Sequence, residues 1–204
     1  MSGGGERGEE RGEERSEEQT MATYCGNERS DEQRMTPLTA SLCRFASFIL
    51  STDMADHFAH VAHLNKQVES VGVDLANEND ACFVIGMMLH AGDVSNPTKN
   101  WDYYNLWTER VMKEFFAQGR KEKELGMRVS DGYDENNPTP QGKFQNGFIA
   151  FIVKPLYEAL GNVKGLDCSA PVRNMEENSL NWKRSDETEK RRSSITSKAA
   201  VVEN

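Results

Sequence analysis

Several features are missing from this 204-residue sequence, and their absence narrows its class. No hydrophobic run approaches the length that a membrane-spanning helix needs. The N-terminal residues, MSGGGERGEE, lack the apolar stretch of a secretory signal. The four cysteines, Cys25, Cys43, Cys82 and Cys168, lie far apart without C-x-x-C spacing, which favours free thiols over a disulfide framework or a zinc knot. We therefore expect a cytoplasmic protein without a membrane partner.

Basic residues are also in the minority. The sequence has 24 Lys and Arg against 33 Asp and Glu, a formal net charge of −9. Nucleic acids and anionic membranes are bound by basic faces, so this balance argues against either as a partner.

Apolar residues are scarce at both ends of the chain. Residues 1–35 repeat Glu, Arg and Gly, and such a segment cannot bury enough surface to offset its ordering entropy, although a transient charged helix is an alternative. Residues 184–204 are charged and serine-rich. We expect both ends to be disordered and residues 36–183 to form one domain. Within the C-terminal tail, Ser194 follows two arginines and a serine, as in a basophilic-kinase site, but such strings are frequent by chance.

The domain shows helical periodicity and no hairpin signal. Pro37 marks a first helical turn, and residues 51–53 offer a cap for a second helix that runs to Gly72. Residues 81–89 are apolar almost all round, which favours a helix buried at the centre of a bundle over the alternative of a buried strand.

The second part of the domain continues the helical pattern. An amphipathic helix covers about 101–119 with a charged continuation to 125, and residues 130–142 form a turn-rich loop. A helix over about 143–160 has Pro155 as a kink or break, and a short last helix spans about 171–182. The fold class that we predict is all-α, a compact helical bundle with disordered tails.

Asp93 lies where the apolar helix ends. A carboxylate at this position faces the unfavourable end of the helix dipole and borders a buried segment, so a cation should compensate its charge. That cation is either a metal ion or a nearby Lys or Arg.

Five blocks of sequence follow one another along the chain. In order they are ILSTDMADHF at 49–58, LHAGDVSNPT at 89–98, WTERVMKEFFAQG at 107–119, QNGFIAFIVKPLY at 145–157, and Asn178 followed by Trp182. Together they resemble the C-terminal half of the class I 3',5'-cyclic-nucleotide phosphodiesterase catalytic domain, over about residues 42–183.

The resemblance implies a site and a reaction. Members of this family use two metal ions, usually zinc and magnesium, to hydrolyse cAMP or cGMP to the 5'-monophosphate in signal transduction. Asp93 matches the zinc-ligating aspartate, and Gln145 matches the glutamine that binds the purine, whose edge suits an amide donor and acceptor. Phe148 and Val111 match the pair that sandwiches the base. Asn96 matches a residue that faces the purine, and its identity slightly favours cAMP as the substrate.

Alternatives to these roles stay open. Phe148 and Val111 could be ordinary core residues, and Gln145 could be a solvated helix residue. His90 and His57 could give structural support to the site instead of binding a ligand. His57, His60 and His63 are spaced by three residues, but the outer two point well apart on a helix, so we do not expect a metal cluster there.

Two departures from the family pattern limit the expected activity. The H-N-x-x-H and H-D blocks, which in the family supply metal ligands and the general acid, are absent from the sequence. Asp93 alone cannot hold a two-metal site, so we identify no catalytic residue and expect this chain alone to be inactive. It could instead be a binding or interaction fragment that associates with an intact homologue. The polar loop 130–142 also replaces a more hydrophobic stretch, which leaves substrate selectivity open.

Overall fold

The structure is a computed structural model that describes residues 37–70 and 72–202. All regular elements in these two ranges are helical, which confirms the predicted all-α class. Of the helices in the described ranges, none combines the length and apolarity that crossing a bilayer requires. The Glu/Arg/Gly-rich segment 1–35, for which disorder is predicted, lies outside the described residues.

The helical elements follow one another with short connections. In chain order they are α2 (Pro37–Leu50), η2 (Met54–Asp56), α3 (His57–Ser70), α4 (Glu78–Asp93), η3 (Asn96–Thr98), α5 (Trp101–Glu124), α6 (Gln141–Phe148), the π-helical turn η4 (Ile149–Val153), α7 (Lys154–Gly161) and α8 (Ser169–Val202).

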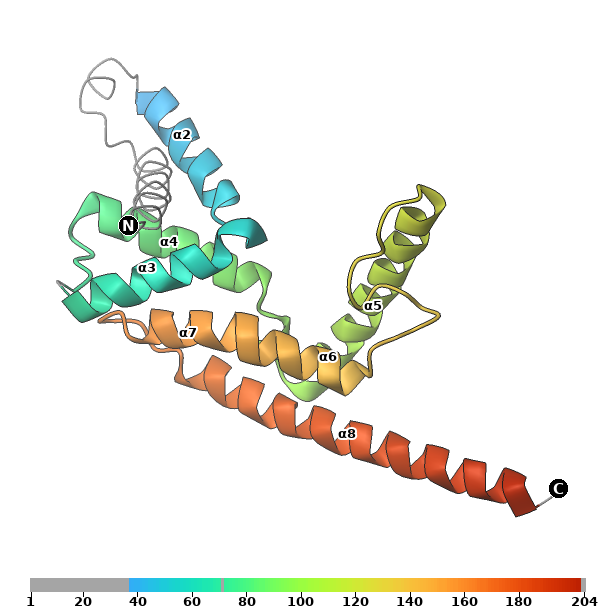
Figure 1. Ribbon diagram of the computed structural model, residues 1–204. Coiled ribbons are helices and arrows are strands. Elements are labelled where there is room, and N and C mark those ends of the chain that lie inside the picture. The colour runs from blue at the N-terminus through green and yellow to red at the C-terminus, as the bar shows by residue number, and fades with distance from the viewer. Residues whose placement is uncertain (1–36, 71, 203–204) are drawn as a thin grey trace, which may run out of the picture.

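The centre of the fold is a stack of helices (Figure 1). α6, η4 and α7 run along one line, with α8 beneath them and α3 and α4 on the other side, while α2 and α5 project from the stack. The core is formed by fully buried side chains from α3, α4, α5, α7 and α8, namely Leu64, Met87, Tyr104, Leu156 and Met175.

Side-chain caps fix where several helices begin. Asn77 accepts hydrogen bonds from the amides of Asn79 (2.9 Å) and Asp80 (3.3 Å), so α4 begins at Glu78. Asn100 caps α5 in the same way by accepting from the amide of Tyr103 at 3.2 Å. The predicted turn at Gly72 is present, with a φ of 78° that favours glycine.

Pro155 breaks the helix that the sequence predicts over 143–160. Proline has no amide hydrogen, and its ring crowds the carbonyl four residues earlier. The chain accommodates this by widening into the π-helical turn η4 before α7 begins, with Pro155 in the first turn of α7. The predicted kink is therefore an enlarged turn that joins two short helices.

Two expectations about helices need correction. Residues 81–89 are helical as predicted, but α4 is not buried all round, because Ile85, Met88 and Leu89 are 49%, 49% and 45% exposed. The last helix does not end near Trp182; α8 continues to Val202. No Gly or Pro interrupts residues 172–202, which are rich in good helix formers such as Lys, Glu, Arg and Ala.

The boundary predicted at residue 183 is thus not marked by a helix end. Beyond it, the carboxylate of Asp186 accepts a hydrogen bond from the amide of Gly142 in α6 at 3.1 Å. Ser194 falls within α8, but its side chain is outside the described side chains, so its modification stays a prediction.

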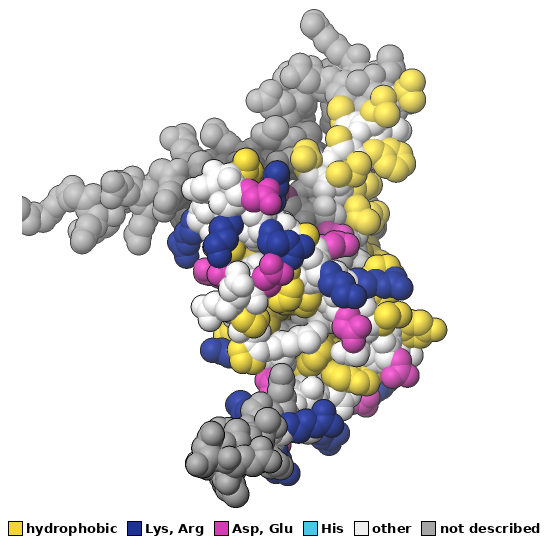
Figure 2. Space-filling model, turned by 90° about the vertical axis from the view of Figure 1, so that its right-hand side faces the viewer, with side chains coloured by type: hydrophobic (Ala, Val, Ile, Leu, Met, Phe, Trp, Pro, Cys, Tyr) yellow, Lys and Arg dark blue, Asp and Glu magenta, His cyan; other side chains and the backbone are white. Residues whose placement is uncertain are grey.

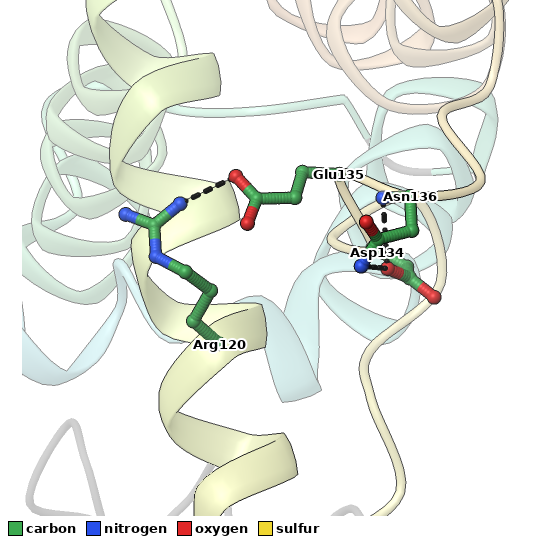
Figure 3. Close-up of polar contacts among 4 residues, drawn as sticks. All are labelled: Arg120, Asp134, Glu135 and Asn136. Atoms are coloured by element: carbon green, nitrogen blue, oxygen red, sulfur yellow. Dashed lines mark hydrogen bonds and ion pairs between the residues drawn. The ribbon is translucent and has the colours of Figure 1, made fainter.

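The segment between α5 and α6, residues 125–140, is called here the 125–140 loop and is docked along α5. Figure 3 shows Arg120 of α5 reaching the carboxylate of Glu135 at 2.6 Å, next to an Asp134–Asn136 turn. Ser130 donates to the carboxylate of Glu122 from its amide (2.7 Å) and its hydroxyl (2.9 Å), which holds the pKa of Glu122 below its ordinary value. The loop is therefore fastened to α5 by polar contacts near its middle, at Ser130 and Glu135.

Close packing also fixes this loop. The ring of Tyr133 stacks on Phe115 with centroids 4.3 Å apart. A Cβ atom at Gly119 of α5 would lie 2.1 Å from the carbonyl oxygen of Tyr133, so only glycine allows this approach.

Candidate functional site

Asp93 is the last residue of α4 and is exposed. The sequence left open whether its cation is a metal ion or a basic side chain. Among the described residues no Lys or Arg forms a salt bridge with Asp93. The titratable group that its charge reaches is His90, one turn earlier: burial, the larger effect, lowers the pKa of His90, and the Asp93 carboxylate raises it.

His90 forms a buried pair with His57. Nδ1 of His57 lies 2.8 Å from Nε2 of His90, and both side chains are fully buried. One nitrogen must donate and the other accept, so the accepting nitrogen carries no proton when the contact is made. Burial is the largest cause that lowers the pKa of His57, followed by the charge of His90. The pair joins the first turn of α3 to the last turn of α4.

The second ring nitrogen of each histidine, the one outside this contact, has no such hydrogen-bond partner in the described part of the chain. Nε2 of His57 and Nδ1 of His90 are buried without a hydrogen-bond partner among the described residues. The carbonyl of Ile152 raises the pKa of His57 and that of Thr52 raises the pKa of His90, but neither contact has hydrogen-bond geometry. This contact between the two histidines has no signal in the sequence.

The other two histidines of α3 do not join this pair. His60 is buried with its ring centroid 6.1 Å from that of Phe83, and His63 is exposed with its centroid 5.0 Å from the same ring. The spacing of His57, His60 and His63 thus places them against different neighbours.

Gln145 is 6% exposed in α6, so it is not a solvated helix residue. Its Oε1 accepts a hydrogen bond from the hydroxyl of Tyr104 in α5 at 2.8 Å. Tyr104 is fully buried, and this burial raises the pKa of its phenol, which therefore stays protonated as a donor. The contact fixes the orientation of the amide and leaves Nε2 as its donor.

Tyr104 is the residue of this group that sequence reasoning missed. In the sequence it is one apolar position of an amphipathic helix, and nothing in the periodicity marks its hydroxyl. Its ring packs edge-on against Trp101 and Trp182, with centroids 6.2 and 5.8 Å away. Helix α8 therefore helps to set where the Tyr104 hydroxyl lies.

Asn96 lies in the short η3 element near the same group. Its Nδ2 donates long hydrogen bonds to the hydroxyl of Thr108 (3.4 Å) and to the carbonyl of Tyr104 (3.5 Å). The η3 turn is held from α8: Nδ2 of Asn178 donates to the carbonyls of Pro97 and Lys99, both at 2.8 Å.

Phe148 and Val111 lie on the same two helices as Gln145 and Tyr104. Phe148 follows Gln145 by one helical turn, on the same side of α6, and is partly buried against the core. Val111 is half-buried in α5. The structure thus brings Gln145 and Asn96 together around Tyr104; among the described contacts, none ties Asp93 to them.

The donor set does not fit a two-metal site. A zinc ion normally takes three or four protein donors. In the described parts of the chain no three His, Cys, Asp or Glu side chains form a group that could hold a metal ion. Asp93 offers one carboxylate. His57 and His90 each use one ring nitrogen in the contact with the other ring.

Comparison with known proteins agrees on one family. The family model described as 3'5'-cyclic nucleotide phosphodiesterase matches residues 33–175. The probable 3',5'-cyclic-AMP phosphodiesterase pde-4 of Caenorhabditis elegans is 40% identical over 136 residues, which are 64% of this chain and 20% of that protein. A 3',5'-cyclic-AMP phosphodiesterase of Drosophila melanogaster, isoform F, is 34% identical over 161 residues, 76% of this chain and 23% of that protein.

A solved structure shows the same relation. LmjPDEB1 in complex with IBMX superposes with a TM-score of 0.67 at 25% identity, covering 74% of this chain and 46% of that one. The chain thus spans about a fifth of the curated relatives that it matches and less than half of the solved one.

Proposed function

This chain belongs to the 3'5'-cyclic nucleotide phosphodiesterase family, and on that premise we propose that it forms the base-binding part of a domain that hydrolyses cAMP or cGMP to the 5'-monophosphate. The observation that carries the proposal is the Tyr104–Gln145 hydrogen bond. An amide held in one orientation can complement the donor and acceptor on a purine edge without the entropy cost of ordering it on binding.

Three further residues complete the proposed base site. Phe148 supplies an aromatic face and Val111 a branched aliphatic side chain, which together suit a flat ring. Asn96, held by Thr108 and by the Asn178-bound η3 turn, faces the same base and favours cAMP slightly.

We propose Asp93 as a ligand of the zinc ion that the family uses, with His90 and His57 as structural support. Its exposure and the lack of a basic partner among the described residues are consistent with this role. Because the described residues offer no complete donor set, we propose that this chain alone does not turn over cyclic nucleotides. We also propose a cytoplasmic location, based on the scattered cysteines.

A second candidate function is a binding module without chemistry. In its favour, the residues that we propose for base binding are present, while no metal-ligand group is found among the described residues. Such a module would bind cyclic nucleotide, or an intact homologue, and release no product.

A chimera separates the two candidates. Residues 37–183 would replace the aligned segment of the Caenorhabditis elegans relative, and hydrolysis of cAMP and cGMP would be measured with Zn²⁺ and Mg²⁺ present. The proposed enzyme function expects turnover by the chimera and none by the purified chain. A folded chimera that binds cAMP without turnover would favour the binding module, and robust turnover by the chain alone would overturn the proposal that it is inactive.

A further inference from the structure

Helix α6, which carries Gln145, has no cap of its own. It has 8 residues, Gln141–Phe148, and two of them are glycines, which weaken a helix. Pro140 stands at the N-cap position and makes no side-chain cap, and the first turn has no acidic residue. The first amides of a helix have no partner within the helix, so α6 needs an acceptor from elsewhere in the protein.

Asp186 of α8 supplies that acceptor. Its Oδ1 accepts a hydrogen bond from the amide of Gly142, 44 residues earlier in the chain, at 3.1 Å. The contact puts an oxygen where an N-cap side chain would put one, and a negative charge at the positive end of the helix dipole. Asp186 therefore does for α6 what Asn77 and Asn100 do for α4 and α5, but it acts from another helix.

Gly142 leaves the room that this cap needs. A Cβ atom at Gly142 would lie 2.5 Å from Cγ of Asp186, so any side chain there would push the carboxylate away from the amide. The φ of Gly142 is not in the left-handed region, so its backbone conformation does not require glycine. The close approach of the carboxylate does.

The charges on α8 itself do not explain where the Asp186 side chain lies. Lys190 comes one helical turn later, at the spacing of a common ion pair. Lys and Arg side chains also gather at the lower end of the view in Figure 2, where α8 leaves the bundle. Among the described residues, however, no Lys or Arg forms a salt bridge with Asp186. The carboxylate has its hydrogen-bond partner on α6 instead.

One side of α8 faces the proposed base site. Ser179, Trp182 and Asp186 are spaced by three and four residues, so they lie on the same side of the helix. The hydroxyl of Ser179 donates to Oδ1 of Asn146 in α6 at 2.5 Å. The buried ring of Trp182 has its centroid 5.8 Å from that of Tyr104. This side of α8 thus contacts both α6 and the phenol that orients the amide on α6.

The two polar contacts from α8 bracket Gln145. One is made at Gly142, before it in α6, and the other at Asn146, directly after it. Helices fray from their ends. Loss of the cap at Gly142 would therefore loosen the first turn of α6, which leads directly to Gln145.

The cap also lies outside the family match, which covers residues 33–175. We propose that Asp186 is a positioning residue for the base site: its carboxylate caps α6 from α8 and so holds Gln145 where a purine edge can bind it. The inference rests on the proposed function for the base and on the contacts of α8 for the positioning.

The test follows the Gln145 side chain in the full chain. NMR order parameters of its Nε2 amide would be compared in the unmodified chain, in Asp186→Ala and in Asp186→Asn. Alanine should lower the order parameter, and asparagine should restore it because asparagine caps helices as well as aspartate does. Calorimetry with EDTA present would give the Kd for cAMP without hydrolysis. This Kd should rise by about fivefold in Asp186→Ala and stay near its original value in Asp186→Asn.

Two further variants make the test specific. Glu187→Ala removes the neighbouring exposed carboxylate and should change neither the order parameter nor the Kd. Gly142→Ala should displace the Asp186 carboxylate and weaken cAMP binding by itself, but it should add no further loss in the Asp186→Ala background. Circular dichroism would check that every variant keeps its helices.

The outcomes separate the positioning role from the proposed function. A Gln145 amide that stays equally ordered in Asp186→Ala, or that Glu187→Ala loosens to the same extent, overturns the proposal. A loosened amide with an unchanged Kd also overturns it, because the cap then supports the fold and not the base site. An amide held by Asp186 in an unmodified chain that does not bind cAMP contradicts the proposed function and leaves the positioning of Gln145 supported.

Discussion

Nδ1 of His57 and Nε2 of His90 lie 2.8 Å apart inside the protein, and this contact ties the start of α3 to the end of α4. It buries two ionisable rings in a position where protonation of the accepting nitrogen would break the contact. The pKa of each ring is lowered, with burial as the largest cause.

The first prediction concerns stability and pH. The histidines are harder to protonate in the folded state than in the unfolded state, where the pKa is about 6.5. Their contribution to stability is therefore fully present above pH 6.5 and is lost as the pH falls below it. The thermal midpoint at pH 5 should lie below that at pH 7.5, and the difference should shrink in His57→Asn. An equal drop in both proteins would show that the pair does not carry the effect.

The second prediction concerns the donor to Gln145. Tyr104→Phe removes a hydroxyl and leaves Oε1 of a buried amide without its partner, which should cost about 1–3 kcal/mol of unfolding free energy. In the chimera described above, KM for cAMP should rise more than kcat falls, since the amide is no longer held. Tyr103→Phe, at the exposed neighbouring position, is the control. An unchanged KM in Tyr104→Phe would remove the proposed orienting role.

The third prediction concerns the η3 turn. Asn178→Ala deletes two hydrogen bonds to the carbonyls of Pro97 and Lys99 and should destabilise the fold by about 2–3 kcal/mol. Asn174→Ala deletes one bond, to the carbonyl of Thr98, from a part-buried position and should cost less. Urea denaturation would measure the loss of unfolding free energy in each variant. A larger loss in Asn174→Ala than in Asn178→Ala would contradict the prediction.

The fourth prediction concerns the docked loop. Gly119→Ala would place a Cβ atom 2.1 Å from the carbonyl oxygen of Tyr133, so the 125–140 loop must move off α5. Limited proteolysis should then cut this loop faster. Gly147→Ala, where a Cβ meets nothing within 4 Å, should leave the cleavage rate unchanged and add up to about 1 kcal/mol of helix stability. Equal cleavage of both variants would mean that the loop is not held at Gly119.

The fifth prediction concerns Asp93. In the chimera, Asp93→Ala should lower both the bound zinc, measured by elemental analysis, and turnover. The exposed carboxylate of Asp102 in the first turn of α5 provides the control substitution, Asp102→Ala. Intact metal content and turnover in Asp93→Ala would end its assignment as a ligand.

The local features of the fold could be predicted because they depend on neighbouring residues. Gly72 makes a turn at a φ of 78° that glycine tolerates, and Pro155 breaks a helix because it lacks an amide hydrogen. The blocks around Asp93 and Gln145 identified the family for a different reason, namely their resemblance to known sequences.

The contacts between distant residues could not be predicted in this way. The hydroxyl of Tyr104 meets an amide 41 residues later, and His57 meets a ring 33 residues later, so both contacts depend on how helices pack. The exposed side of α4 was missed for a related reason. An apolar sequence pattern predicts that a helix face is buried, but it does not show whether a packing partner for that face is present. The length of α8 was missed because its charged sequence lacks an apolar face, although it also lacks a helix breaker.

The π-helical turn η4 has a consequence for how side chains are aimed. An α-helix turns by about 100° per residue, so a turn with one residue more than usual changes the phase of everything that follows it. Gln145 and Leu156 stand on the two sides of this phase step, one bonded to Tyr104 and the other in the core. Deleting a single residue from Ile149–Val153 would bring the two helices into phase and swing one of these side chains away from its partners, without altering either residue.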